Sequence, residues 1–174
     1  MNIVYKIFNV LIYHGSDIAV PVPRILSSNR LLDFGTGFYS TSSYEQAKRW
    51  SMRVSERKNS KKQIISFYEF DPGSAEKELQ FKHFPSPDLE WLNFVTLCRS
   101  GKDIDHDYDI VMGPVANDNV YATIQLYETG ILSVAETIIR LKVEKTFDQI
   151  LFHTQEALMY CSYLRYEKSG GPSG

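Results

Sequence analysis

The spacing of hydrophobic and polar positions changes several times along the chain, which predicts a mixture of strands and helices. Apolar and aromatic runs, rich in β-branched residues and bounded by Gly, Pro, Asn or Asp, are typical of strands that are largely buried. Such runs predict strands at residues 7–13, 38–41, 63–70, 109–112 and 149–154. The sequence Asp71-Pro72-Gly73 predicts a turn at the end of the third of these.

Apolar residues three or four positions apart, together with capping residues, predict four helices. Ser43 precedes a helix that extends to about Arg57, and Ser86 with Pro87 opens one that ends before Gly101. Residues 117–119 can cap a helix over 120–128, and Ser133 with Glu136 forms a capping box. The predicted inward positions of the second and fourth helices are Leu89, Leu92, Val95, Ile138, Ile139 and Leu141. Residues 157–165 fit either a helix or an extended tail.

The helix over residues 43–57 carries two stripes. Ala47, Trp50 and Val54 share one face, and Arg49, Arg53 and Arg57 form a basic row. Of the chain's 19 lysines and arginines, seven lie between Lys48 and Lys62, against a single acid there. This cluster is either a solvated helix face or a contact for phosphate or nucleic acid.

Length and composition indicate one domain. The chain has 174 residues, of which 43% are hydrophobic, and a net charge of −2. Strands and helices mix without strict βαβ alternation, so the fold class is α+β, with residues 1–168 as the domain and 169–174 as a linker-like tail. Cys98 and Cys161 lack a disulfide framework and are expected to be buried free thiols. No histidine spacing indicates a metal site.

The sequence shows no signal peptide and no apolar run of membrane-spanning length. We therefore expect a cytoplasmic protein without a membrane partner, or one delivered by a route that leaves no such mark.

Two segments group residues of the kind found at binding sites. Tyr13-His14-Gly15-Ser16 ends an apolar run with an imidazole, a bare backbone and a hydroxyl, and Asp33-Phe34-Gly35-Thr36-Gly37-Phe38-Tyr39-Ser40-Thr41 combines a glycine turn with an aromatic strand. Each also has a purely structural interpretation, as a strand cap and as an ordinary connector.

Together these segments resemble the NAD-binding core of ADP-ribosyltransferases of the diphtheria-toxin and poly(ADP-ribose) polymerase type. With a third block, Asp107-Tyr108-Asp109-Ile110-Val111-Met112-Gly113-Pro114-Val115-Ala116, they are also similar to a bacterial family of unassigned function that we associate with this superfamily. The resemblance implies a single-domain fold with a split antiparallel β-sheet core flanked by helices.

The resemblance also implies roles for particular residues. His14 would bond a ribose hydroxyl of NAD, the Gly15 backbone would clamp the carboxamide, and Ser16 would assist. Tyr39 matches the family's tyrosine, and Trp50 falls where the polymerases place the residue that stacks on nicotinamide. Either Trp50 stacks on the ring, or Tyr39 does and Trp50 belongs to the core. The implied NAD-binding set is Tyr13, His14, Gly15, Ser16, Gly37, Phe38, Tyr39 and Trp50.

The third catalytic position departs from the family pattern. A glutamate is usual there, but this chain has Gln149, so the implied catalytic set is His14, Tyr39 and Gln149. An amide can orient a hydroxyl but cannot supply a negative charge. Glu156 and Asp118 are alternative carboxylates, with surface charge and helix cap as their structural interpretations.

The activity implied is NAD-dependent mono-ADP-ribosyl transfer to a protein or nucleic acid, as by a bacterial toxin or effector with a cognate antitoxin or immunity protein. NAD would be a substrate. The alternatives are an NAD glycohydrolase and an inactive module that binds NAD or a protein partner.

Overall fold

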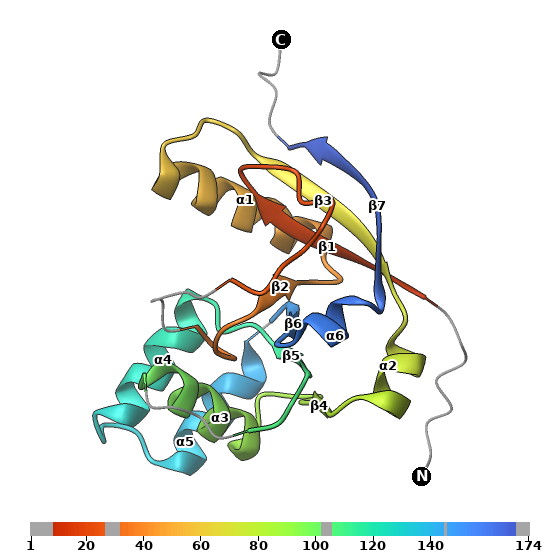
Figure 1. Ribbon diagram of the computed structural model, residues 1–174. Coiled ribbons are helices and arrows are strands. Elements are labelled where there is room, and N and C mark those ends of the chain that lie inside the picture. Colours follow the sequence, from red (N-terminus) through yellow and green to blue (C-terminus); the bar gives the residue numbers. More distant parts are fainter. Residues whose placement is uncertain (1–8, 27–31, 102–105, 145, 170–174) are drawn as a thin grey trace.

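The strands of the protein form two sheets that lie against each other. The computed structural model describes residues 9–26, 32–101, 106–144 and 146–169 (Figure 1). The first sheet is antiparallel, in the order β1-β3-β7, and consists of β1 (Val10–Ser16), β3 (Ile64–Phe70) and β7 (Cys161–Lys168). The second has the order β2-β6-β5-β4, from β2 (Phe38–Ser40), β6 (Asp148–Phe152), β5 (Ile110–Pro114) and β4 (Phe81–His83). The β4–β5 pair is parallel, so the expectation of a wholly antiparallel core is wrong at this edge.

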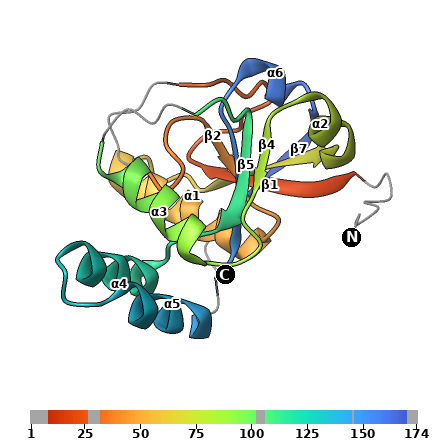
Figure 2. The same ribbon diagram turned by 90° about the horizontal axis from the view of Figure 1, so that it is seen from below.

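Six helices in the described residues cover these sheets. They are α1 (Tyr44–Lys58), α2 (Pro72–Glu78), α3 (Leu89–Arg99), α4 (Asp118–Glu128), α5 (Val134–Val143) and α6 (Gln155–Leu158). Figures 1 and 2 both show α4 and α5 side by side at the end of the molecule away from β7. None of the helices in the described ranges is long and apolar enough to span a bilayer.

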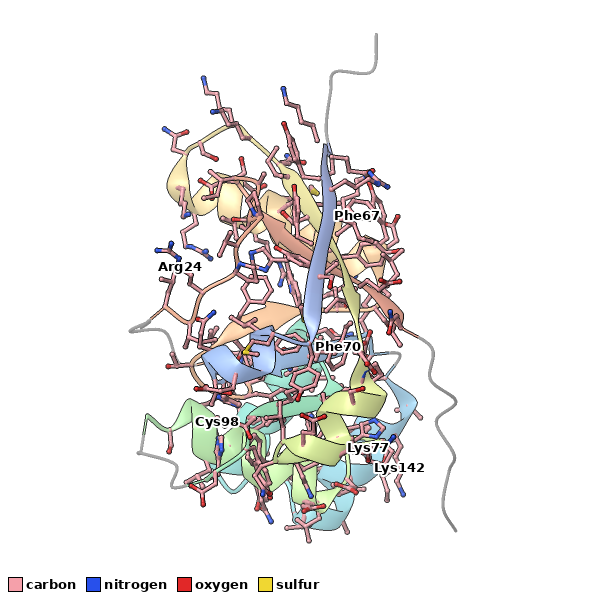
Figure 3. The ribbon with its side chains drawn as sticks, turned by 45° about the vertical axis from the view of Figure 1, so that its right-hand side comes forward. Arg24, Phe67, Phe70, Lys77, Cys98 and Lys142 are labelled. Atoms are coloured by element: carbon pink, nitrogen blue, oxygen red, sulfur yellow. The ribbon has the colours of Figure 1, made fainter. Side chains whose placement is uncertain are left out.

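Alternation along the strands divides the interior into three hydrophobic clusters. Ile12, Phe70 and Phe152 belong to the cluster between the two sheets, where the last two rings meet edge to face at 5.2 Å. Phe67 instead packs with Ala47 of α1 on the outer face of the first sheet, and Figure 3 shows how Phe67 and Phe70 lie along β3. The third cluster joins the outer face of the second sheet to α3, α4 and α5. The order of layers is therefore helix, sheet, sheet, helices, which confirms the α+β class.

The two sheets meet through β1 and β2. Tyr13 and Thr41 exchange both backbone hydrogen bonds, at 2.8 and 3.0 Å, in an isolated antiparallel bridge. Beyond this bridge β1 continues in register with β3, whereas β2 pairs with β6. The two strands consequently separate at His14 and Gly15, and a cleft lies at this separation.

Most predicted elements are present, with shifted boundaries. The first strand runs on through Ser16, so His14 and Gly15 lie inside it, and residues 7 and 8 lie outside the described residues. The turn predicted at 71–73 is instead the start of α2, with Asp71 as N-cap and Pro72 as first residue. Likewise Asp88, not Ser86, caps α3. The strand predicted at 109–112 is β5, which continues through Gly113 and ends at Pro114.

Some burial predictions are wrong. Leu89 is 45% and Ile139 is 67% exposed, whereas Leu92, Val95 and Leu141 are fully buried. Cys98 is a buried free thiol, as expected, but the free thiol of Cys161 is only half-buried. Figure 3 shows Cys98 on α3. Ser169, assigned to the tail, is buried and donates its backbone N–H to the backbone oxygen of Gln63 at 2.9 Å, so this residue is part of the fold.

Candidate functional site

A cleft of about 370 Å³ opens where β1 and β2 separate. Its walls come from the end of β1, the segment before β2, one face of α1, the residues after β5 and the first residues of β6. Of the sequence-predicted site residues, the lining includes His14, Gly15, Ser16, Tyr39, Trp50 and Gln149. Residues up to 135 positions apart in the chain are therefore brought to one place.

The imidazole of His14 is held in one tautomer. Its Nδ1 lies 2.7 Å from the backbone oxygen of Tyr39. A carbonyl oxygen can only accept, so Nδ1 carries the proton and Nε2 of the neutral ring is an acceptor. Burial is the main cause that lowers the pKa of His14, with a smaller contribution from the positive charge of Lys58, and the bond to Tyr39 opposes them. The ring also stacks on Phe38, with centroids 4.5 Å apart. His14 thus offers a fixed, neutral acceptor.

Gly15 exposes backbone to the cleft because α1 passes directly behind it. A Cβ atom at this position would lie 1.9 Å from the backbone oxygen of Ala47, so only glycine fits. Polar backbone groups alternate between the two edges of a strand. Because the backbone groups of Tyr13 point toward β2, those of Gly15, two residues further on, point to the same edge. No backbone bridge joins Gly15 to the described part of β2, so its N–H and C=O face the cleft.

Two aromatic residues lie in the cleft wall. The hydroxyl of Tyr39 donates to the backbone oxygen of Gly35 at 2.7 Å and accepts from the N–H of Phe34 at 3.2 Å. Burial raises its pKa well above the usual value. The phenol therefore fastens the turn before β2, and only its ring is available to a ligand. Trp50 is half-buried and lines the cleft, so it does not belong to the core.

The side-chain amide of Gln149 is embedded in a polar network. Its Nε2 lies 3.1 Å from Oδ2 of Asp33 and 3.3 Å from the backbone oxygen of Pro114. The same Oδ2 accepts the N–H of Ala116 at 2.9 Å, and Oδ1 of Asp33 lies 3.2 Å from Nε of Arg99. Burial raises the pKa of Asp33, and the charge of Arg99 is the largest cause that opposes this rise. A carboxylate, which also lines the cleft, therefore lies behind the Nε2 end of the Gln149 amide.

Three predicted binding residues do not line the cleft. The Tyr13 ring packs edge to face on Tyr44 and Phe67, at 5.7 and 5.1 Å. Gly37 lies against β6, where a Cβ would be 2.3 Å from the backbone oxygen of Phe152. Phe38 is a core residue that supports the His14 ring from behind. Strand alternation explains the positions of Tyr13 and Phe38, because the neighbours of a cleft residue along a strand point to the other face.

Neither alternative carboxylate is shown in the cleft. Glu156 is exposed on α6 and is not part of the lining, in line with its interpretation as surface charge. The side chain of Asp118 lies outside what the structure describes.

Within the described ranges, no group of three or more His, Cys, Asp or Glu residues is arranged to hold a metal ion.

The basic row on α1 divides between two surroundings. Arg53, Arg57 and Lys58 line the cleft, and Nζ of Lys58 pairs with Asp17 at 2.8 Å. The Arg49 guanidinium instead lies over the ring of Phe147, 5.2 Å from its centroid. Three cationic side chains thus border the cleft at its α1 side.

Sequence reasoning assigns no role to Asp33 or Ala116, although both belong to the blocks that carry the resemblance. Each lies at one end of its block and lines the cleft, and the Asp33 carboxylate accepts the backbone N–H of Ala116 at 2.9 Å. The available signal is an acid between apolar residues, Leu32 and Phe34, which is unusual at a position that is only 8% exposed.

Residues 10–166, most of the chain, match a family described as "Protein of unknown function (DUF3990)". No curated protein matches the chain.

Proposed function

The chain belongs to the DUF3990 family, and we propose that this member binds NAD in the cleft and transfers its ADP-ribose unit to a macromolecular acceptor. The proposal combines the resemblance of three sequence blocks to ADP-ribosyltransferases with the chemistry of the groups that line the cleft. Only that resemblance supports a role as a bacterial toxin or effector and the existence of a cognate antitoxin or immunity protein.

The size and lining of the cleft suit part of a dinucleotide. Small-molecule sites have volumes of about 300–1,000 Å³ and combine apolar walls with a few polar groups. The cleft, at about 370 Å³, is lined by two aromatic side chains, Tyr39 and Trp50, on either of which a planar nicotinamide ring could stack. This arrangement supports assigning the nicotinamide end of NAD to the inner part of the cleft.

Polar groups for orientation come from β1. The free backbone edge at Gly15 offers one donor and one acceptor, which match the oxygen and the amino group of a carboxamide. The neutral Nε2 of His14 is suited to accept a hydrogen bond from a ribose hydroxyl. Nicotinamide is a good leaving group, and cleavage of its bond to ribose passes through a transition state with oxocarbenium character, so orientation and electrostatic stabilisation are the main tasks of the protein.

The cationic side chains favour an anionic ligand. Arg57 and Lys58 lie at the α1 wall, and the diphosphate of NAD carries negative charge. Gln149 would take the place of the family's glutamate as acceptor for a ribose hydroxyl. Many members of the resembled superfamily with an altered triad transfer single units, so by this resemblance we propose transfer of single ADP-ribose units rather than chain extension.

The observation that carries the proposal is that His14, Gly15 and Gln149, from β1 and β6, line one cleft together with two aromatic rings. These are the residues to which the sequence resemblance independently assigns contacts with NAD.

The test follows the two halves of labelled NAD separately. Purified protein is incubated with a cell lysate and NAD labelled in the adenylate moiety, while free nicotinamide is measured in parallel. Transfer predicts nicotinamide release together with label on material sensitive to protease or nuclease, and this sensitivity identifies the acceptor class.

Two other results would contradict the proposal. Nicotinamide release without bound label indicates hydrolysis, and NAD binding without turnover indicates an inactive binding module, a result that the amide at 149 would explain.

His14→Ala should reduce turnover by about 100-fold or more, as expected for loss of an orienting group. His83→Ala, on β4 and outside the cleft, is the matched control.

A further inference from the structure

The orientation of the Gln149 amide follows from its neighbours. Both groups within hydrogen-bond distance of Nε2, the carboxylate of Asp33 and the carbonyl of Pro114, can only accept. The NH₂ group must therefore face them, and its two hydrogens are both used inside the protein. What remains of the amide is Oε1, so Gln149 can offer a ligand in the cleft only an acceptor.

Asp33 is held in the form that this orientation needs. Each of its described partners donates: the N–H of Ala116, Nε of Arg99 and Nε2 of Gln149. A protonated carboxyl would find no acceptor among them, so the arrangement fits the carboxylate. Burial raises the pKa of Asp33, and these three partners act in the opposite direction.

A carboxylate behind an amide changes what the amide can do. Hydrogen bonds to an ionised acceptor are stronger than neutral ones, and hydrogen bonds in a chain polarise one another at low local dielectric. Donation from Nε2 to Asp33 therefore increases the partial negative charge on Oε1. Gln149 is 3% and Asp33 is 8% exposed, so water screens this effect weakly.

We propose that Asp33 is a positioning residue that fixes and polarises Gln149, so that Oε1 accepts a ribose hydroxyl in place of the family's glutamate. The inference rests on the proposed function. The roles of the two residues are then complementary, because Gln149 contacts the substrate and Asp33 supplies the negative charge from behind.

The first test is Asp33→Asn. An asparagine can turn its own NH₂ toward residue 149, which favours a flipped Gln149 amide with its donor group toward the cleft. We expect kcat for nicotinamide release to fall by about 10- to 100-fold, by analogy with the loss seen when the outer partner of a metal-ligating residue is removed. KM for NAD should change less, because the lost interaction acts mainly in the transition state.

The second test is Gln149→Glu, which restores the glutamate of the family pattern. If Gln149 acted alone, this variant would be more active than the wild type. With Asp33 behind it, two carboxylates would meet at the position where Nε2 now lies 3.1 Å from Oδ2. We therefore expect lower activity. The exchanged pair Asp33→Asn/Gln149→Glu again places an N–H against a carboxylate, and its kcat should exceed that of Gln149→Glu by about tenfold or more.

The matched control is Asp109→Asn. Asp109 also accepts hydrogen bonds from a backbone N–H and a hydroxyl, at 3.0 and 2.8 Å, but it precedes β5 at the end opposite to Pro114. Its loss should lower the melting temperature without lowering kcat. Melting temperatures and kcat per folded protein are measured for every variant, so that unfolding is separated from loss of positioning.

The outcomes separate the two proposals. A wild type that neither cleaves nor binds NAD overturns the proposed function, and this inference with it. An active wild type whose Asp33→Asn variant keeps full kcat, or whose exchanged pair is no better than Gln149→Glu, overturns only the role of Asp33. The expected pattern is a loss in both single variants with recovery in the pair.

Discussion

Nδ1 of His14 lies 2.7 Å from the backbone oxygen of Tyr39, and this contact joins the two sheets where their strands part. It fixes the His14 ring relative to the cleft, and it settles which nitrogen carries the proton. A side chain of β1 thereby takes its orientation from the backbone of β2, a strand of the other sheet.

The pH dependence of stability should reveal the buried state of His14. Its folded-state pKa lies below the ordinary value of 6.5, so the unfolded chain takes up this proton at a higher pH than the folded chain. The neutral His14 side chain therefore makes its full contribution to the free energy of unfolding above pH 6.5. This contribution is lost as the pH falls from 6.5 through the folded-state pKa. We expect the free energy of unfolding in urea to decline less between about pH 7 and 5 in His14→Asn than in the wild type.

Other histidines do not confound that comparison. Burial lowers the pKa of His106 and lowers that of His153 to about 4, so both add to the decline in either protein. Equal slopes in wild type and His14→Asn would contradict a neutral, buried imidazole at position 14.

Gly15→Ala should damage both stability and the cleft. The new Cβ would meet the Ala47 backbone oxygen at 1.9 Å, and a helix backbone cannot yield as a side-chain end can. We expect a loss of about 1–3 kcal/mol in chemical denaturation, typical of overpacking, and weaker NAD binding because α1 must move. Gly73→Ala is the control: its Cβ would have Asp71 as its nearest neighbour, at 3.6 Å, and α2 should tolerate or gain from it.

Tryptophan fluorescence should report ligand binding. Trp50 lines the cleft, whereas Trp91 is fully buried and donates its indole N–H to the backbone oxygen of Pro114 at 3.1 Å. If nicotinamide stacks in the cleft, NAD should quench part of the emission, and Trp50→Phe should remove most of that quenching. Undiminished quenching in Trp50→Phe would place the ligand elsewhere.

The charge at the α1 wall should influence NAD affinity. Arg57 is exposed and borders the cleft, so Arg57→Gln should raise KM for NAD by about two- to fivefold at low salt, the effect of one partly screened charge. The difference should shrink as ionic strength rises. Arg140→Gln, on the exposed face of α5, serves as the control, and an equal change in both variants would argue against a phosphate contact at Arg57.

Local motifs are the part of the fold that could be predicted well. Ser133 and Glu136 form both hydrogen bonds of the predicted capping box, because the two partners are only three residues apart. The start of α2 escapes prediction because Asp-Pro-Gly is a signal for a turn as well as for a capped helix, and only the contacts that follow decide between them. The predicted burial is wrong at Leu89 and Ile139, since periodicity indicates a face but not how far a neighbour covers it.

For the site, the sequence by itself determined which segments border the cleft, because a His-Gly pair after an apolar run and a glycine turn before aromatic residues are local patterns. Only the tertiary structure decided how these residues are arranged. It turned Tyr13 and Phe38 away from the cleft and tied the Tyr39 hydroxyl into a turn. It also placed Asp33 behind Gln149, 116 residues away. Such a contact depends on the register of β2 with β6 and on the path of the segment before β2, and no local pattern of residues encodes either of them.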